Sequence, residues 1–309
     1  MYYKQANIVI IGAGRIATSI LNGLINARFN VQSVFSKDIN SAEQLVKKFG
    51  VNHFSNNLSQ VKEDTNLFLL TVPDNQITYV ANEIEKLNIN FSDSLFVHFS
   101  GALSSSVLAK LKNKKADTAS FHIMQSFPTK DFVPLENLTA AIETDSKDAE
   151  KFLFSLSQKL GMKPFKLFKD DKINYHLAGV YSSNFFVGNL LGAEKVLQEN
   201  KTNYPNYENL ILPIVSTTLN NIKSKGLDNS LSGPIQRGEL EVIKKHIEKL
   251  KESRQDEFYV AGKNIFLLNY LCQSITILKI LKIKKTKLND KQKKVYNYLV
   301  DEFSVLINK

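Results

Sequence analysis

The most constraining feature of the sequence lies at its start, where an apolar strand, a glycine turn and an apolar-periodic helix follow one another. Residues 7–11 read NIVII, the turn reads Gly12-Ala13-Gly14-Arg15-Ile16-Ala17, and helical spacing continues to residue 27. Gly12 allows a tight turn, Gly14 lets the backbone approach a phosphate, and Ala17 permits close packing of helix on strand. The free amides at the start of the helix favour an anion. This arrangement predicts a dinucleotide pyrophosphate site, although an ordinary strand–turn–helix with small residues remains the alternative.

The end of the second expected strand indicates which dinucleotide binds. Residues 31–35 are followed by Ser36 and Lys37, at the position where an NAD site places an acidic residue on the ribose 2'-hydroxyl. A hydroxyl and a cation suit a 2'-phosphate instead. The sequence therefore predicts NADP in preference to NAD. Asp38 keeps NAD open as the alternative, and Lys37 is also readable as a plain surface lysine.

Alternating strand and helix patterns in the first half predict a doubly wound α/β sheet with an antiparallel extension at one edge. Strand signals nearly vanish after Asp170. We therefore expect an N-terminal Rossmann domain over residues 1–169 and an all-α C-terminal domain over residues 170–309. The expected strands cover residues 7–11, 31–35, 51–54, 65–72, 94–99, 118–122, 138–142 and 164–168, and the expected helices cover residues 15–27, 42–49, 74–87, 104–112 and 146–160.

Composition agrees with a two-domain enzyme of 309 residues, of which 43% are hydrophobic. No apolar run reaches the 18 or so residues of a membrane span, so no membrane is expected. The single cysteine, Cys272, excludes an internal disulfide and favours the cytoplasm. The net charge of +10 is lysine-rich and densest over residues 279–294, where it is typical of a solvated helix face. We therefore expect neither nucleic acid nor a metal site.

Polar residues follow three of the expected central strands. Because ligands bind beyond the carboxyl ends of strands in a doubly wound sheet, we expect these residues to border the site. The segment Val72-Pro73-Asp74 would line the nicotinamide ribose. Ser100 and His122 would contact substrate. For each of them, ordinary turn hydrogen bonds are the alternative.

The segment from Lys172 to residue 198 is predicted to be one helix, apolar on most of its circumference and hence buried on nearly all sides. His176, Ser183 and Asn184 form a polar stripe on it. Their partners would be either protein groups or a ligand, and we favour a ligand. His176 would then exchange a proton with substrate, Asn184 would orient substrate or nicotinamide, and Lys172 is a second candidate acid.

Several motifs together give the chain a family resemblance. GAGRIA, TVPD, VHFSG, FHIMQSF, YHLAGVYSSNF and SGPIQRGE occur in that order between residue 5 and about residue 275. The chain resembles bacterial proteins that pair a Rossmann-like domain with a helical domain of unknown function. They belong to the 6-phosphogluconate dehydrogenase-like superfamily, together with pyrroline-5-carboxylate reductase and ketopantoate reductase.

The resemblance implies an NADP-binding oxidoreductase whose helical domain forms a homodimer and closes the cleft. It also implies that Arg237 binds an anionic substrate bidentately. The chain departs from the family at Glu239, where aspartate is usual. It also does not match the lysine that the related beta-hydroxyacid dehydrogenases use as their acid, which is followed four residues later by asparagine, because Lys172 is followed at that spacing by His176. Two functions stay open at this point: an NADP-dependent oxidoreductase acting on a small anionic carbonyl, hydroxy or imino compound, and a non-catalytic NADP-binding sensor or scaffold.

Overall fold

The computed structural model describes residues 6–198, 202, 204, 206–252, 259–285 and 287–308. Its internal contacts divide the chain into two compact units, Met1–Phe186 (unit 1) and Val187–Lys309 (unit 2). Each unit has hydrophobic core residues of its own. The division falls beyond the boundary at residue 169 that marks the end of the strand pattern, because the helix after the sheet belongs to unit 1. The predicted domain limits stay a prediction.

Unit 1 is built on one sheet with the order β3-β2-β1-β4-β5-β6-β7-β8. All neighbouring pairs are parallel except β6 and β7, so the predicted doubly wound sheet with an antiparallel edge is confirmed. The direction of the chain across the sheet reverses between β1 and β4. The strands are β1 (Asn7–Ile11), β2 (Asn30–Phe35), β3 (Phe54–Ser55), β4 (Leu67–Leu70), β5 (Leu95–His98), β6 (Asp117–Ile123), β7 (Thr139–Glu143) and β8 (Lys163–Lys166).

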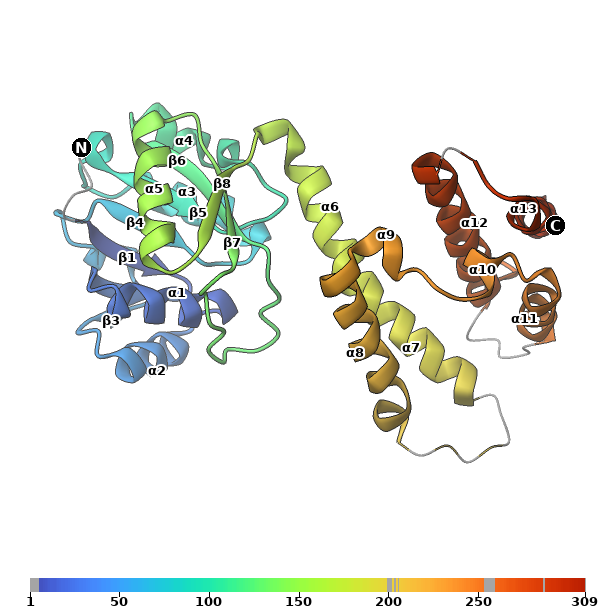
Figure 1. Cartoon of the computed structure of the whole chain (residues 1–309). Helices are drawn as coiled ribbons and strands as arrows, with labels where there is room; N and C mark the ends of the chain where they lie inside the picture. Colours follow the sequence, from blue (N-terminus) through green and yellow to red (C-terminus); the bar gives the residue numbers. More distant parts are fainter. Residues whose placement is uncertain are drawn as a thin grey trace. The chain divides into compact units, whose positions relative to one another are not determined.

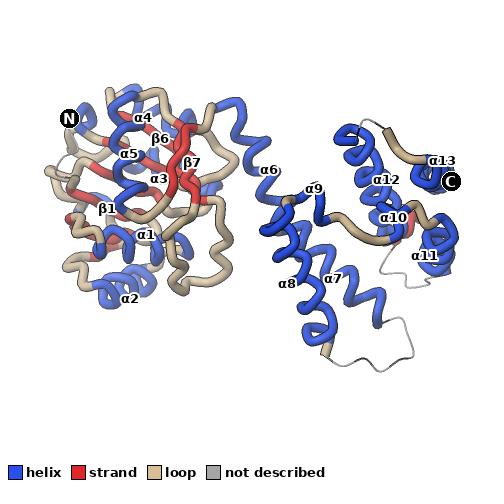
Figure 2. Tube along the Cα trace, viewed as in Figure 1, coloured by secondary structure: helices blue, strands red, loops and turns tan. Residues whose placement is uncertain are grey.

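Helices cover both faces of this sheet (Figures 1 and 2). Side chains alternate between faces along a strand, so Ile8 and Ile10 of β1 join one core cluster while Val9 and Ile11 join the other. The first cluster contains the apolar residues of α1, α2 and α5, and the second contains those of α3 and α4. The helices are α1 (Arg15–Asn26), α2 (Ile39–Phe49), α3 (Asp74–Ile84), α4 (Ala109–Asn113) and α5 (Lys147–Lys159).

Two local expectations within unit 1 were wrong in detail. The strand expected at residues 51–54 is β3 at Phe54–Ser55, and the helix expected from residue 104 begins as a 3₁₀ turn, η3 (Ser105–Leu108), before α4. The turn forms where Glu143 accepts hydrogen bonds from the Ser105 amide and hydroxyl, at 2.6 and 2.8 Å. A buried carboxylate from β7 therefore sets the local conformation, and a local pattern does not contain that information.

The helix expected over residues 172–198 is two helices, α6 (Lys172–Ser182) and α7 (Asn184–Gln198). Ser183 leaves helical geometry with φ −124° and ψ −68°. The Ser182 hydroxyl donates to the Ala178 carbonyl, and the Ser183 hydroxyl meets that of Ser126 at 3.0 Å. Serine side chains that bond in these ways commonly bend or end a helix.

The expected burial of this segment on nearly all sides was also wrong for the single chain. Lys172 is the one buried residue of α6, and α7, all of which is described, has none. Large apolar side chains such as Leu177, Phe185 and Leu191 are exposed. The apolar pattern is present, but among the described residues only Lys172 of these two helices is buried.

Unit 2 is helical where it is described, apart from the short pair β9 (Tyr259–Val260) and β10 (Lys263–Asn264). Its core is formed by α11, α12 and α13, with Leu271 and Val295 fully buried. Helix α12 is long and apolar enough to cross a membrane by length and composition, but five of its residues are buried in the unit. The remaining helices are α8 (Tyr207–Lys225), α9 (Leu227–Ser230), α10 (Pro234–Arg237), α11 (Leu240–Glu252), α12 (Ile265–Lys285) and α13 (Asp290–Asn308).

Candidate active site

The glycine turn after β1 has the geometry that a phosphate-binding turn requires. Gly12 adopts φ +111°, and a Cβ built on it would lie 2.8 Å from the carbonyl of Thr71. Its amide donates to the Phe35 carbonyl at 2.7 Å. Gly14 caps α1 without a side-chain hydrogen bond, so the first helical amides have no side-chain acceptor at the N-cap. Of the other turn residues, Ala13 and Ala17 are buried, Ile16 is half-buried and Arg15 is exposed.

Residues at the end of β2 distinguish the two candidate nucleotides. Asp38 is the N-cap of α2, where its carboxylate accepts from the amides of Asn40 and Ser41 and from the Ser41 hydroxyl. Those hydrogen bonds lower the pKa of Asp38. These three hydrogen bonds engage both carboxylate oxygens of Asp38 in the cap of α2 and leave about one of its acceptor sites for a ribose hydroxyl. Ser36 and Lys37 stand immediately before this cap, at the predicted 2'-phosphate position.

The ends of β4 and β5 are joined through buried hydroxyls. The Thr71 hydroxyl donates to the Gly12 carbonyl at 2.6 Å, and the Ser100 hydroxyl donates to Asp74 at 2.6 Å. Ser100 also accepts from the Leu103 amide at 2.9 Å. Ser100 thus fixes the loop after β5 rather than presenting a free hydroxyl, and its predicted substrate contact stays a prediction. Between these groups, Val72 is half-buried and Pro73 is exposed.

Lys172 is almost fully buried where α6 begins. Its ammonium donates to the Ser120 hydroxyl at 2.6 Å and to the Ser100 carbonyl at 3.2 Å. Burial lowers the pKa of Lys172 to about 8, against the opposing charges of Glu143 and Asp74. The lysine therefore ties α6 to the ends of β5 and β6, and its hydrogen bonds are directed into the protein.

His98, at the end of β5, is fully buried and has both ring nitrogens engaged. Nδ1 accepts from the Ser100 amide at 3.2 Å, so Nε2 is the protonated nitrogen that donates to the Ser104 carbonyl at 3.2 Å. Burial and the charge of Lys172 lower the pKa of His98 to about 4. His98 is thus a neutral structural residue that shapes the loop in front of the site.

His122, at the end of β6, is held by a residue that the sequence analysis missed. Its Nδ1 lies 3.0 Å from the Tyr175 hydroxyl, and burial raises the pKa of Tyr175 to about 12. Burial, followed by the charge of Lys172, lowers the pKa of His122 to about 4. Both side chains are therefore neutral near pH 7, and when the Tyr175 hydroxyl donates to Nδ1 the His122 proton lies on Nε2. In the sequence, Tyr175 is distinguished only by its place beside His176.

A cleft of about 390 Å³ opens next to this histidine. The rings of His122 and His176 are 6.5 Å apart, and a Cβ on Gly101 would lie 2.8 Å from the His122 ring and 2.7 Å from the His176 ring. Gly101 thus leaves room for both histidines. The predicted stripe of His176, Ser183 and Asn184 lines this cleft together with His122, Met124, Gln125, Ser126, Gly179, Val180 and Ser182.

One predicted site residue lies in unit 2. Arg237, at the end of α10, forms a bidentate ion pair with Glu239, with its Nε and Nη2 at 2.7 and 3.0 Å from the carboxylate oxygens. Gly238, between the two, adopts φ +72°. The glutamate that departs from the family pattern is therefore the partner of the arginine in this structure. The substrate-binding role of Arg237 stays a prediction.

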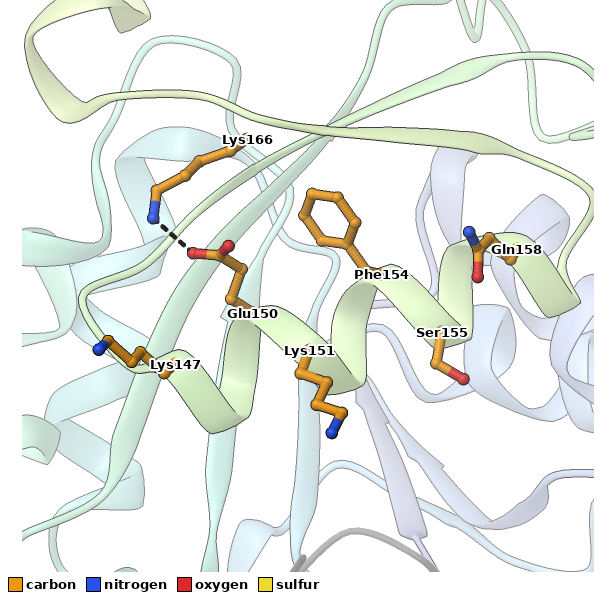
Figure 3. Close-up of a pocket in the computed structure, with 7 residues that line it drawn as sticks. All are labelled: Lys147, Glu150, Lys151, Phe154, Ser155, Gln158 and Lys166. Carbon is orange, nitrogen blue, oxygen red and sulfur yellow. Dashed lines mark hydrogen bonds and ion pairs between the residues drawn. The ribbon is translucent and has the colours of Figure 1, made fainter.

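A second depression, at the far edge of the sheet, has a different character. It lies along α5 and β8, and it is lined by Lys147, Glu150, Lys151, Phe154, Ser155, Gln158 and Lys166 (Figure 3). Lys166 pairs with Glu150 at 2.6 Å. None of the predicted site residues belongs to it. Among the described residues, no group of three metal-ligand side chains is placed to hold an ion.

Two segments of the chain match known protein families. Residues 7–97 match the family described as NADP oxidoreductase, coenzyme F420-dependent, and residues 138–265 match a domain of unknown function, DUF2520. The first match contains the glycine turn, Ser36, Lys37 and the end of β4, and it confirms NADP as the cofactor predicted from the sequence. No curated protein matches the chain.

Solved structures show the same fold. A Bacteroides fragilis protein provisionally described as an NADP oxidoreductase is 23% identical, with a TM-score of 0.70 over 88% of this chain and 98% of that one. An Aspergillus terreus reductive aminase in complex with NADPH and ethyl-5-oxohexanoate is 10% identical, with a TM-score of 0.58 over 96% and 93% of the two chains.

A pyrroline-5-carboxylate reductase from Coxiella burnetii is 15% identical, with a TM-score of 0.54 over 98% of this chain and 99% of that one. At these identities the likeness concerns the fold. The expectation of a Rossmann-type domain followed by a helical domain of unknown function is confirmed. The chain is thus similar to the coenzyme F420-dependent NADP oxidoreductase family over residues 7–97 and to the DUF2520 domain over residues 138–265.

Proposed function

We propose that this protein is an NADP-dependent oxidoreductase acting on a small anionic carbonyl, hydroxy or imino compound bound in the cleft between β6 and α6. The observation that supports this proposal most is that the predicted nucleotide site and the cleft lie at the same edge of the sheet. The parallel strands β1, β4, β5 and β6 are neighbours in this order and end at the same edge. A nucleotide held at the first of them would extend toward the cleft beside the last.

The residues present fit this nucleotide. The absence of a Cβ at Gly12 keeps the turn tight against Thr71, and the uncapped amides that follow Gly14 would bind the pyrophosphate. Ser36 and Lys37 would bind the 2'-phosphate. The segment from Val72 to Asp74 would border the nicotinamide ribose. When bound, the nicotinamide supplies or accepts the hydride.

In the cleft, the two histidines take different roles. His122 is neutral, and with Nδ1 accepting from the Tyr175 hydroxyl its Nε2 would donate a hydrogen bond to a carbonyl oxygen or an imine substituent without transferring the proton. His176 is exposed in the cleft and would exchange the proton that accompanies hydride transfer. Asn184 would orient the substrate. Tyr175 would keep His122 in the donating tautomer.

The uncovered apolar helices support a second part of the proposal, that the protein is a homodimer formed through its helical domain. Helices α7 and α8 have no buried residue among those described. Leu191, Leu212 and Ile214 are 58%, 51% and 64% exposed, respectively. A second copy of the chain would bury this surface at about 25 cal/mol for each Å² of apolar area.

The function is tested by incubating purified protein and NADPH with a panel of 2-oxo acids, cyclic imines and coenzyme F420, and by running the reverse direction with hydroxy acids and NADP. Turnover is read as loss or gain of NADPH absorbance. We expect at least one class to react, and His176→Ala to abolish most of the rate while NADPH affinity is retained. Tight NADPH binding with no turnover across the panel would contradict the enzymatic proposal and favour a sensor.

A further inference from the structure

The loop between β6 and β7 connects the cleft with the far end of the nucleotide site. It begins in the cleft wall at Met124 and continues over the first part of unit 1 (Figure 1, green). The Val133 amide donates to the buried Ser19 hydroxyl of α1 at 2.9 Å, and Leu135 is buried in the core. Phe127 packs against the same core cluster. The loop is therefore anchored on both sides of residues 128–132.

Between these anchors, Lys130 sits on a short hydrogen-bonded turn. The Thr129 hydroxyl donates to Asp131 at 2.7 Å and accepts from the Asp131 amide at 3.2 Å. The Lys130 ammonium reaches the first turn of α2 and donates to the Ser41 hydroxyl at 2.8 Å. The hydrogen bond thus places the ammonium of an exposed lysine at the first turn of α2, two hydrogen bonds from the carboxylate that caps this helix.

The position that Lys130 reaches already carries charge. The Ser41 hydroxyl donates to Asp38, whose carboxylate caps α2 two residues after Ser36. Hydrogen bonds from Ser41 lower the pKa of Asp38 most, and the charge of Lys130 acts in the same direction. The carboxylate alone would repel a phosphate at this place. Lys37 and Lys130 together supply two positive charges against its one negative charge.

We propose that Lys130 is a specificity-determining residue that joins Ser36 and Lys37 in binding the 2'-phosphate of NADP. The inference rests on the proposed function and deepens it. The ammonium shifts from the Ser41 hydroxyl to a phosphate oxygen, while the anchored loop keeps Lys130 beside the start of α2.

The test is a titration of the Lys130→Met variant with NADPH and NADH by isothermal calorimetry. Methionine keeps the length of the side chain and removes its charge. A hydrogen bond between charged groups contributes about 1.5 to 3 kcal/mol, so we expect the Kd for NADPH to rise at least tenfold. The Kd for NADH should change less than twofold. The Kd for adenosine 2'-monophosphate should rise as the Kd for NADPH does, and the Kd for adenosine 5'-monophosphate should change as little as the Kd for NADH.

Lys47→Met is the matched control, since Lys47 is an exposed lysine of α2 that pairs with Glu43 at 2.7 Å. This variant should bind both nucleotides as the unaltered protein does. Lys130→Arg should recover most of the NADPH affinity. Thermal melting without ligand identifies any loss of folding in each variant.

The outcomes separate this inference from the function on which it rests. If Lys130→Met weakened the binding of NADPH and of NADH equally, the inference would be overturned, because Lys130 would then only support the structure of the loop. Unchanged binding of both would overturn it as well, while leaving the NADP proposal intact. Failure of the unaltered protein to bind either nucleotide would overturn both.

Discussion

The central strands of unit 1 and the helices α7 and α8 are all rich in apolar residues, but only the strands bury them within the described chain. Every residue of β4 and β5 is buried, and the polar groups at the strand ends are hydrogen-bonded. No described residue of α7 or α8 is buried, although α7 is rich in leucine and phenylalanine. An apolar pattern therefore predicts that a surface will be covered, but it does not identify what covers that surface.

The largest expected effect comes from a substitution in the well-packed unit 1, at the glycine turn after β1. Gly12→Ala places a Cβ 2.8 Å from the Thr71 carbonyl at φ +111°. Strain of about 1 to 3 kcal/mol, together with displacement of the turn, should weaken NADPH binding about 100-fold or more. Calorimetry measures the loss.

Gly188→Ala is the matched control for this substitution. Gly188 lies within α7, and a Cβ added to it would have nothing within 4 Å. Alanine there should leave NADPH affinity unchanged and stabilise the helix by about 0.5 to 1 kcal/mol. An unaltered Kd for NADPH in Gly12→Ala would contradict the role given to the turn.

The second effect tests whether a partner covers the exposed helices. Leu191→Asp puts a charge on the apolar face of α7, and an unpaired charge buried in a dimer interface costs about 3 kcal/mol or more. The dissociation constant of the dimer should therefore rise at least 100-fold, measured by sedimentation velocity. Gln198→Asp adds the same charge to the same helix and should leave the dimer intact. A monomeric unaltered protein would refute the dimer.

The third effect concerns the pH dependence of folding. Burial holds the pKa of His98 and of His122 at about 4 in the folded protein, below the value near 6.5 of an unfolded chain. The unfolded state therefore binds more protons, and stability falls as the pH falls below 6.5. Between pH 6.5 and 5, each histidine should remove about 1.5 kcal/mol from the free energy of unfolding.

Denaturant titrations across this pH range measure the loss. NMR titration of the histidine signals shows whether His98 and His122 cause this loss. In the folded protein, the signals of these two residues should not titrate above pH 5. A free energy of unfolding that stays flat between pH 6.5 and 5 would contradict the burial assigned to both rings.

The smallest expected effect concerns the hydrogen bond between Tyr175 and His122 beside the cleft. Tyr175→Phe removes the hydroxyl that is hydrogen-bonded to His122 Nδ1, and loss of one neutral hydrogen bond is worth about 1 kcal/mol. We expect kcat to fall about fivefold with the Kd for NADPH unchanged, and nitrogen NMR to show His122 as a mixture of tautomers. Tyr181→Phe alters an exposed tyrosine of α6 and should change neither quantity.

How much of this could be predicted depends on where the partner of each residue lies. The glycine turn and the strands were predictable because their patterns are local: the apolar run of residues 7–11 and the glycines that follow it are adjacent in the sequence. The grouping of His176, Ser183 and Asn184 at one cleft was also predictable, although they were expected on one continuous helix. The break at Ser183 was not, because the serine side chains there bond to the Ala178 carbonyl and to Ser126, which is 57 residues away from Ser183.

The same reasoning explains the residues that were missed. Tyr175 is recognisable only through its contact with His122, and Lys130 only through its contact with Ser41, 89 residues away. Asp38 has the composition of a ribose-binding acid, but the structure uses it as a helix cap. Ser100 has a hydroxyl at the predicted edge, but its hydrogen bonds are internal. In each case a long-range contact or a cap decides the role of the side chain.

The central claim is that the turn after β1 and the residues after β2 bind a 2'-phosphorylated dinucleotide. It is tested most directly by calorimetric titration of the unaltered protein with NADPH and with NADH under identical conditions. The account predicts that both nucleotides release heat and that NADPH binds at least tenfold more tightly. Absence of heat with either nucleotide, or tighter binding of NADH, would contradict it.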